Sequence, residues 1–330
     1  MPINGHAAKT ITPLNKLING ININQDHHFF SFTMQDSTHP IEAYISPLTI
    51  FNARKISHVN KNPSLYPLGK TVLIHWQAKD NVKIEGLLTY PVNYHKGHRY
   101  PLIVEIHGGP GDVFYQRYIA RNSVFPIAVY AAEGYAYLRP NIRGSLGYGL
   151  HFRQLNKNDW GGKDFQDVLS GVKQVIKMGI ADPNHIGIQG WSYGGYMTAW
   201  AITQTHLFKA AVIGAGITDL ISYTGTNDLP YFVPNALGGY FWNKETLYLK
   251  RSPIFFVKHV TTPTLLEYGE NDIRVPKTQG FEFYRALKLR KIHTKMLVYP
   301  DTQHSITKPQ LIFDAAKQDL LWFNRYLKNK

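Results

Sequence analysis

The chain has 330 residues, 44% of them hydrophobic, and its 36 Lys and Arg against 22 Asp and Glu give a formal net charge of +14. This length and composition predict one large globular domain, or one domain with a smaller companion. No run of about 18 apolar residues occurs, so we expect no transmembrane span. The absence of cysteine excludes disulfides, thiolate metal sites and a cysteine nucleophile.

The basic residues are scattered along the chain. They form no run of five or more and match no nucleic-acid-binding module, so we expect a solvated basic surface and no nucleic-acid partner. Residues 1–16 lack the apolar core of a secretory signal, and we therefore expect a cytoplasmic protein.

Two regions differ in their patterns. Residues 1–70 hold short β-like runs, 29–34 and 41–45, between polar, turn-rich stretches, which predicts a small all-β segment. From Thr71 to residue 330, strands and helices alternate, which predicts a mostly parallel sheet flanked by helices, an α/β fold. The expected strands are 71–77, 83–90, 102–106, 135–139, 185–189, 210–213, 264–268 and 296–299, and the expected helices are 127–133, 163–178, 195–204, 278–290 and 311–327.

The sequence Gly190-Trp191-Ser192-Tyr193-Gly194 has the form G-x-S-x-G and lies between a predicted strand and a predicted helix. In a loop this pattern would be only a turn, but this context is typical of the nucleophile elbow of α/β hydrolases. The turn holds the serine in a strained conformation that lifts Oγ above the sheet. The N–H of Tyr193 then faces the position of a developing oxyanion.

A serine nucleophile needs a base, and the base needs an orienting carboxylate. Asp272, with Glu270 as its rival, follows the strand 264–268, and His304 follows the strand 296–299. Alone, Asp272 could cap a helix, and His304 is one of 15 histidines. Their order and their positions after successive strands support Ser192, Asp272 and His304 as one set.

A second oxyanion donor is expected after the strand 102–106, where His107-Gly108-Gly109-Pro110 would let backbone N–H groups approach a reacting carbonyl; a plain tight turn is the alternative. Two pairs of histidines could in principle bind a metal ion: His95 with His98, and His27 with His28. Neither pair has an obvious third ligand, so we expect these histidines to be surface residues and expect no metal site. Gly144-x-x-Gly147-x-Gly149 has the wrong spacing for a dinucleotide, so no cofactor is expected.

Several stretches resemble one family, the prolyl oligopeptidases, and within it the acylaminoacyl-peptidase-like branch. The resemblance covers roughly residues 56–330, and its motifs appear in the family's order. They are Tyr100-Pro-Leu-Ile-Val-Glu-Ile-His-Gly-Gly-Pro110, Asn141-Ile-Arg-Gly-Ser145, Asp159-Trp-Gly-Gly162 with Asp164 and Asp167, Gly190-Trp-Ser-Tyr-Gly-Gly195, Arg251-Ser-Pro-Ile254, Gly269-Glu-Asn-Asp-Ile-Arg-Val-Pro276 and the segment ending in His304.

The resemblance implies a role for each site residue. Ser192 would be acylated, His304 would act as general base and acid, and Asp272 would orient it. The N–H groups of Tyr193 and Gly109 would hold the oxyanion. Arg274 would bind a substrate carbonyl one residue upstream of the cleaved position. An uncharged, bulky side chain would be accepted by a pocket lined by Ile217, Leu220, Tyr223 and Val275.

This chain departs from the family pattern in three places. Gln303 stands where relatives have Gly before the histidine, and Tyr268 stands where many have His. The residues before the hydrolase part resemble the last strands of the family's β-propeller and the return linker, and they are too few to build a complete propeller. No counterpart of the acidic pair that grips a free substrate amine is visible, so exopeptidase specificity is not supported.

We therefore predict a serine peptidase that cleaves oligopeptides or releases acylated N-terminal residues through an acyl-enzyme. A carboxylesterase of the same fold is the alternative, and a non-catalytic hydrolase-fold protein is a third hypothesis that the complete triad disfavours. The expected partners are a peptide substrate and, as an open possibility, a second copy of the chain.

Overall fold

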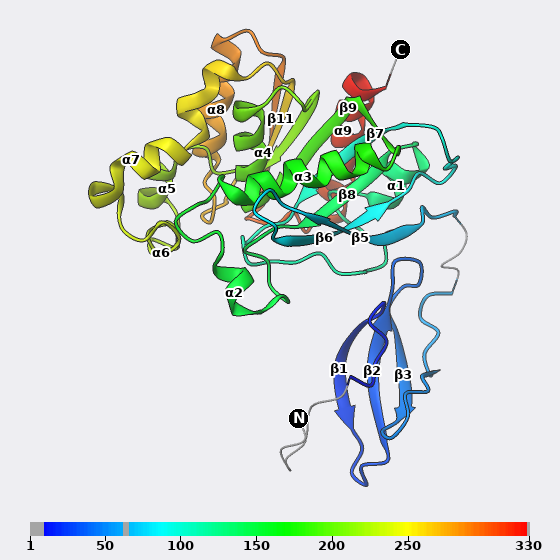
Figure 1. The fold of residues 1–330 in the computed structure, drawn as a ribbon. Coiled ribbons are helices and arrows are strands. Elements are labelled where there is room, and N and C mark those ends of the chain that lie inside the picture. Colours follow the sequence, from blue (N-terminus) through cyan, green and yellow to red (C-terminus); the bar gives the residue numbers. More distant parts are fainter. Residues whose placement is uncertain (1–9, 62–65, 329–330) are drawn as a thin grey trace.

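The computed structural model describes residues 10–61 and 66–328, which form two β-sheets and the helices around the larger one (Figure 1). Most of the segment 1–16, where no secretory signal is expected, lies outside the described residues. The smaller sheet is antiparallel, in the order β1-β2-β3-β4. Its strands are β1 (Leu17–Ile23), β2 (Phe29–Gln35), β3 (Glu42–Pro47) and β4 (Arg54–Lys55).

The small sheet has an aromatic core of its own. Phe30 and Phe32 are buried and stack with ring centroids 5.0 Å apart, and Phe51 packs against both rings. Within residues 10–61 no helix forms, in agreement with the predicted all-β segment. A single antiparallel sheet of this size is the unit that a β-propeller repeats.

The larger sheet has eight strands in the order β12-β11-β10-β9-β7-β8-β6-β5. Its neighbours from β12 to β8 pair in parallel, whereas β6 and β5 continue the sheet as antiparallel strands. This arrangement confirms the predicted α/β-hydrolase fold. The strands are β5 (Thr71–Gln77), β6 (Lys83–Thr89), β7 (Tyr100–Ile106), β8 (Ala136–Asn141), β9 (Ala181–Trp191), β10 (Ala210–Gly214), β11 (Thr264–Gly269) and β12 (Thr294–Tyr299).

Helices cover both faces of the larger sheet, because its central strands are apolar on both sides. On one face pack α1 (Ile127–Ala132) and α9 (Pro309–Leu327), and on the other pack α3 (Lys163–Lys177), α4 (Tyr193–Gln204) and α8 (Lys277–Leu289). The remaining helices are α2 (Gly149–Gln154), α5 (Leu220–Thr226), α6 (Phe232–Leu237), α7 (Phe241–Arg251) and the 3₁₀ segment η1 (Pro253–His259). Across the described residues, no helix has both the length and the apolar character needed to cross a bilayer.

Three helices, α5 to α7, fill the connection between β10 and β11, where the sequence predicts none. They are short, and Pro234 and the pair Gly238-Gly239 interrupt the helical period. In Figure 1 they form a lobe beside α8 at the edge of the larger domain. The strand β1 was also not predicted: most of its residues are exposed, so pairing with β2 rather than burial defines it.

The two parts of the chain touch at the end of β2. The N–H of Tyr118 donates to Oε1 of Gln35, and the N–H of Ile119 donates to the carbonyl of Ser37, each at 3.2 Å. The larger sheet begins at Thr71 with β5, and the domain boundary at residue 70 stays a prediction. These two bonds place the small sheet against the loop that follows β7.

Candidate active site

Ser192 occupies a sharp turn between β9 and α4, with φ 62° and ψ −119°. This is an unfavourable region for a residue with a Cβ, and the turn is fixed on both sides. The Ser192 N–H donates to the carbonyl of Gly214, and the Ser192 carbonyl accepts from the N–H of Tyr196, both at 2.9 Å. The helix therefore begins at Tyr193, two residues earlier than predicted, and Ser192 is its N-cap.

The two glycines of the motif are required by close packing. A Cβ on Gly194 would collide with the carbonyl oxygen of Ile106, at the end of β7. A Cβ on Gly190 would lie 2.5 Å from the backbone of Gly194. Neither position has room for a side chain, so the strand and the helix can meet only across glycine.

Asp272 and His304 are in contact. Oδ2 of Asp272 lies 2.8 Å from Nδ1 of His304. Its other oxygen, Oδ1, accepts the N–H groups of Arg274 at 2.8 Å and Val275 at 2.9 Å, and the side chain is buried. The rival Glu270 is exposed and accepts the N–H of Asp301 instead. Of the two candidate acids, the structure pairs Asp272 with the histidine.

This contact determines the role of the imidazole. Because a carboxylate only accepts, Nδ1 carries the proton and Nε2 is left as the acceptor. The loop around His304 is also tied to the elbow, since Nε1 of Trp191 donates to the His304 carbonyl at 2.7 Å. Sequence reasoning missed this bond, because nothing in the sequence marks a backbone carbonyl as the partner of a tryptophan.

The loop after β7 lies over the elbow. A Cβ on Gly108 would sit 3.6 Å from Cβ of Ser192, and Gly109 has φ +113°, a conformation that favours glycine. His107 is buried, which lowers its pKa, and its Nε2 lies 2.8 Å from Oγ of Ser145. This contact connects the loop to the segment after β8.

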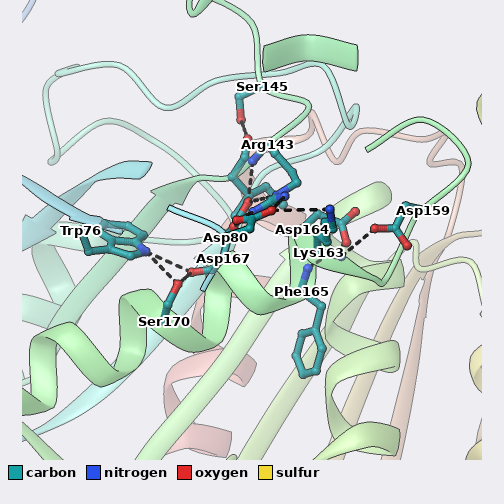
Figure 2. Close-up of polar contacts among 11 residues, drawn as sticks. Trp76, Asp80, Arg143, Ser145, Asp159, Lys163, Asp164, Phe165, Asp167 and Ser170 are labelled. Atoms are coloured by element: carbon teal, nitrogen blue, oxygen red, sulfur yellow. Dashed lines mark hydrogen bonds and ion pairs between the residues drawn. The ribbon is translucent and has the colours of Figure 1, made fainter. Parts of the chain in front are cut away.

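That segment is held by the ion-pair network in Figure 2. The buried guanidinium of Arg143 contacts Asp167 of α3 through Nη2 at 2.7 Å and Nε at 2.8 Å, and Asp80 of the β5–β6 turn through Nη1 at 2.8 Å. The Arg143 N–H also donates to Asp167 at 2.9 Å. The network fixes Ser145, two residues on, and through Ser145 the position of His107.

The side chain of Tyr193 points away from the sheet end, into the core. Its hydroxyl donates to Oδ2 of Asp164, at the start of α3, and Trp160 packs against its ring at 5.1 Å between centroids. Burial raises the pKa of Asp164 to about 7. Contacts with Asp164 and Trp160 therefore fix the side chain of Tyr193 in the core. Its backbone N–H lies in the first turn of α4, where N–H groups have no partner within the helix.

Arg274 lies in the loop that supplies Asp272, and its partner was not predicted. Nε and Nη2 of Arg274 contact Oδ1 and Oδ2 of Asp228 at 2.6 and 3.0 Å, a bidentate pair that lowers the pKa of Asp228. The Arg274 side chain remains 42% exposed. The guanidinium is therefore held by Asp228, close in the chain to Asp272, and the side chain remains partly exposed to solvent.

The predicted pocket residues belong to the core. Each has an exposed fraction of 1% or less, and they are Ile217, Leu220, Tyr223 and Val275. Val275 is adjacent to the site, because its N–H contacts Asp272. The contribution of these four side chains to a substrate pocket stays a prediction. Among the residues described, no three His, Asp or Glu gather as metal ligands.

The fold and the elbow define this protein as an α/β hydrolase. Asp272, His304, Ser192 and the glycine loop follow β11, β12, β9 and β7, so they lie at the carboxyl ends of parallel strands, where ligands bind in such sheets. The prolyl oligopeptidase family matches residues 122–330, and the chain belongs to this family.

Individual relatives agree with this assignment. The chain is 32% identical over 316 residues, 94% of its length, to the uncharacterized peptidase YuxL of Bacillus subtilis, of which it covers 47%. It is 34% identical over 237 residues, 69% of its length, to the acylamino-acid-releasing enzyme of Arabidopsis thaliana, of which it covers 30%. A solved acylaminoacyl peptidase superimposes on 97% of the chain with a TM-score of 0.87 at 27% identity, and the chain covers 51% of it. The chain thus spans about half, or less, of the length of these relatives.

Proposed function

We propose that this protein is a serine peptidase that hydrolyses peptide bonds of oligopeptides or of acylated N-terminal residues. The contact of 2.8 Å between Asp272 and His304, on loops that follow neighbouring strands, carries the proposal together with the strained turn at Ser192. An acid–imidazole pair at the strand ends next to a serine elbow has one established use, the activation of that serine.

The chemistry follows from the tautomer of His304. Nε2 accepts the proton of the Ser192 hydroxyl as Oγ attacks the substrate carbonyl. The N–H groups of Tyr193 and Gly109 stabilise the oxyanion, and the imidazolium then gives its proton to the leaving amine. Water attacks the resulting ester by the same steps in reverse, and Asp272 keeps Nδ1 protonated throughout.

Two observations favour peptides as substrates. The acylaminoacyl peptidase that superimposes on this chain is described in complex with Z-Gly-Gly-Phe-chloromethyl ketone, a peptide derivative. Arg274 also presents a partly exposed guanidinium beside the acid loop, and an N–H donor at that place suits a peptide carbonyl. A carboxylesterase would use the same triad but would not need this donor.

The test is hydrolysis of a matched amide and ester that carry the same acyl group. A peptidase cleaves both, and Ser192→Ala lowers both rates by several orders of magnitude. Arg274→Met should raise KM for a peptide and leave a small ester unaffected. Ester turnover without amide turnover would support the carboxylesterase, and amide turnover that survives Ser192→Ala would refute the proposed nucleophile.

A further inference from the structure

A cavity of about 370 Å³ adjoins the proposed active site, on the side of the sheet where α1 packs. It borders Gly108 of the glycine loop, Trp191 before the nucleophile, and Ser305 after His304. Its floor comes from the ends of β7 and β8, and its outer wall from the loop 112–125. At about 30 Å³ per water molecule, it has room for roughly a dozen waters, or for one to two amino-acid residues.

Arg139 lies at the floor of this cavity, and two of its three guanidinium nitrogens have no hydrogen-bond partner among the described residues. The residue is only 5% exposed, and within the described part of the chain neither Nε nor Nη2 makes a hydrogen bond. Its packing neighbour is the ring of Phe114, 5.5 Å from the guanidinium carbon. Arg143, four residues on, is equally buried but has carboxylates around it. Buried N–H donors without an acceptor are costly, so the two free nitrogens of Arg139 indicate a ligand.

The charges that line the cavity favour an anion. Three arginines line the cavity, Arg117, Arg121 and Arg139, and only two acidic residues do so, Glu105 and Asp112. Glu105 accepts the hydroxyl of Tyr137 at 2.8 Å; burial raises its pKa, while the charges of Arg139 and Arg121 lower it. Oδ1 of Asp112 accepts the N–H of Val113. Among the ion pairs of the described residues, none joins Arg139 to either carboxylate.

We propose that this cavity binds a carboxylate of the substrate, with Arg139 as the principal donor. The inference rests on the proposed peptidase function, because the cavity is lined by Gly108 and Ser305, the chain neighbours of the proposed oxyanion donor Gly109 and the proposed base His304. An arginine presents two parallel N–H groups that match a carboxylate. The carboxylate is either the free C-terminus of a short peptide or an acidic side chain, and substrate pairs distinguish these sources.

The small N-terminal sheet has a part in this site. The loop that forms the outer wall of the cavity is the one bound by Gln35 and Ser37. Gln35 and Ser37, at the end of β2, therefore support the loop that carries Arg117 and Arg121.

The experiment measures binding rather than turnover. Calorimetry on Ser192→Ala compares N-acetyl-Phe-Ala with its C-terminal amide, and N-acetyl-Phe-Glu-amide with N-acetyl-Phe-Gln-amide. We expect the acid to bind at least tenfold more tightly than the neutral peptide in at least one pair. The first pair reports a C-terminal carboxylate and the second an acidic side chain. Because no bond is cleaved, this result does not depend on whether the wild type is a peptidase.

Substitutions at the cavity test whether the preference for the acidic peptide arises there. In the Ser192→Ala background, Arg139→Gln should reduce the preference to less than twofold, whereas Arg285→Gln, an exposed residue of α8, should leave it unchanged. If Arg139→Gln does not fold, Glu105→Gln decides, because removing the competing negative charge should increase the preference. Equal affinities in both pairs, a preference that survives Arg139→Gln, or one that Glu105→Gln lowers would overturn the proposal.

Discussion

The turn at Ser192 depends on glycines for steric reasons, and this dependence can be tested at two glycines that differ only in their surroundings. Gly194 lies against the carbonyl of Ile106, where no Cβ fits. Gly225, in α5, has nothing within 4 Å of the place where its Cβ would be. The same substitution should therefore have opposite effects at these two positions.

Gly194→Ala should destabilise the protein by about 3 kcal/mol or more, because the new Cβ meets backbone atoms that cannot move without opening the contact between β7 and α4. Gly225→Ala should be neutral or stabilise by about 0.5–1 kcal/mol, since alanine is the better helix former. Urea denaturation of both variants measures the difference. Equal stabilities would contradict the packing described for the elbow.

Trp191 connects the nucleophile turn to the loop of His304, and we expect this bond to matter for rate. Trp191→Phe keeps an aromatic ring but removes the N–H that donates to the His304 carbonyl. A slightly misplaced base should lower kcat by about tenfold and change KM little, because a shift of about 1 Å is costly in catalysis. Trp242→Phe, at a side chain that is 63% exposed, is the control. An unchanged kcat in Trp191→Phe would show that the loop holds its position without this bond.

At the scale of single residues, the sequence predicts those site residues that a local motif or their order along the chain identifies. Ser192 is defined by its own neighbours, and Asp272 and His304 by the strands that precede them. The pair Arg274–Asp228 was not predictable, because 46 residues separate its members and the helices between them were not expected. The same holds for Arg139: its sequence neighbours form an ordinary strand, and only the fold shows that its donors face a cavity.

Among the elements, the start of α3 supports the site through carboxylates in the core. Asp164 accepts the Tyr193 hydroxyl and the N–H of Phe165, and burial raises its pKa to about 7. In the unfolded chain an aspartate titrates near 3.9. The folded state therefore binds the proton more tightly, and this group destabilises the fold increasingly as the pH rises from about 4 to about 7.

Asp164→Asn should remove that pH dependence, because the amide does not ionise. Relative to the variant, the wild type should lose up to about 4 kcal/mol of unfolding free energy between pH 4 and pH 7, from three pKa units at about 1.4 kcal/mol each. Denaturation curves at several pH values measure the difference, and Asp26→Asn, at an exposed residue, should show no such trend. Parallel pH profiles for wild type and Asp164→Asn would contradict the raised pKa.

Long elements with a clear period were predictable, and short ones were not. The helices α3, α8 and α9 begin and end within two residues of their predicted limits, because each presents an apolar stripe over three turns or more. The helices α5 to α7 have 7, 6 and 11 residues, and α7 contains a kink at Lys244. Such segments are stabilised by packing against neighbours, and a single sequence does not carry that information.

In the molecule as a whole, two buried acids interact electrostatically between the last helix and the central sheet. Asp319 of α9 and Glu267 of β11 are both buried, and within the described residues both oxygens of Asp319 lack a hydrogen-bond partner. Burial raises the pKa of Glu267 to about 8 and that of Asp319 well above its ordinary value. Both groups are neutral while protonated, and ionisation within the core is unfavourable.

Asp319→Asn should therefore stabilise the protein at pH 9, by about 1–3 kcal/mol, and by less at pH 5, where the wild-type carboxyl keeps its proton. The sign follows from the raised pKa, which makes stability fall as the pH increases. Chemical denaturation at both pH values measures the effect, and Asp301→Asn, at a highly exposed residue, is the control. A variant that is less stable than the wild type at pH 9 would show that Asp319 has a partner in solution.

Covalent labelling tests the central claim most directly, since it depends on Ser192 being activated by His304. The full chain is treated with a fluorophosphonate, and the labelled peptide is identified by mass spectrometry. We predict stoichiometric labelling at Ser192, none in Ser192→Ala, strongly slowed labelling in His304→Ala, and normal labelling in His58→Ala, at an exposed histidine. A label at another residue, or labelling that persists in Ser192→Ala, would contradict this account.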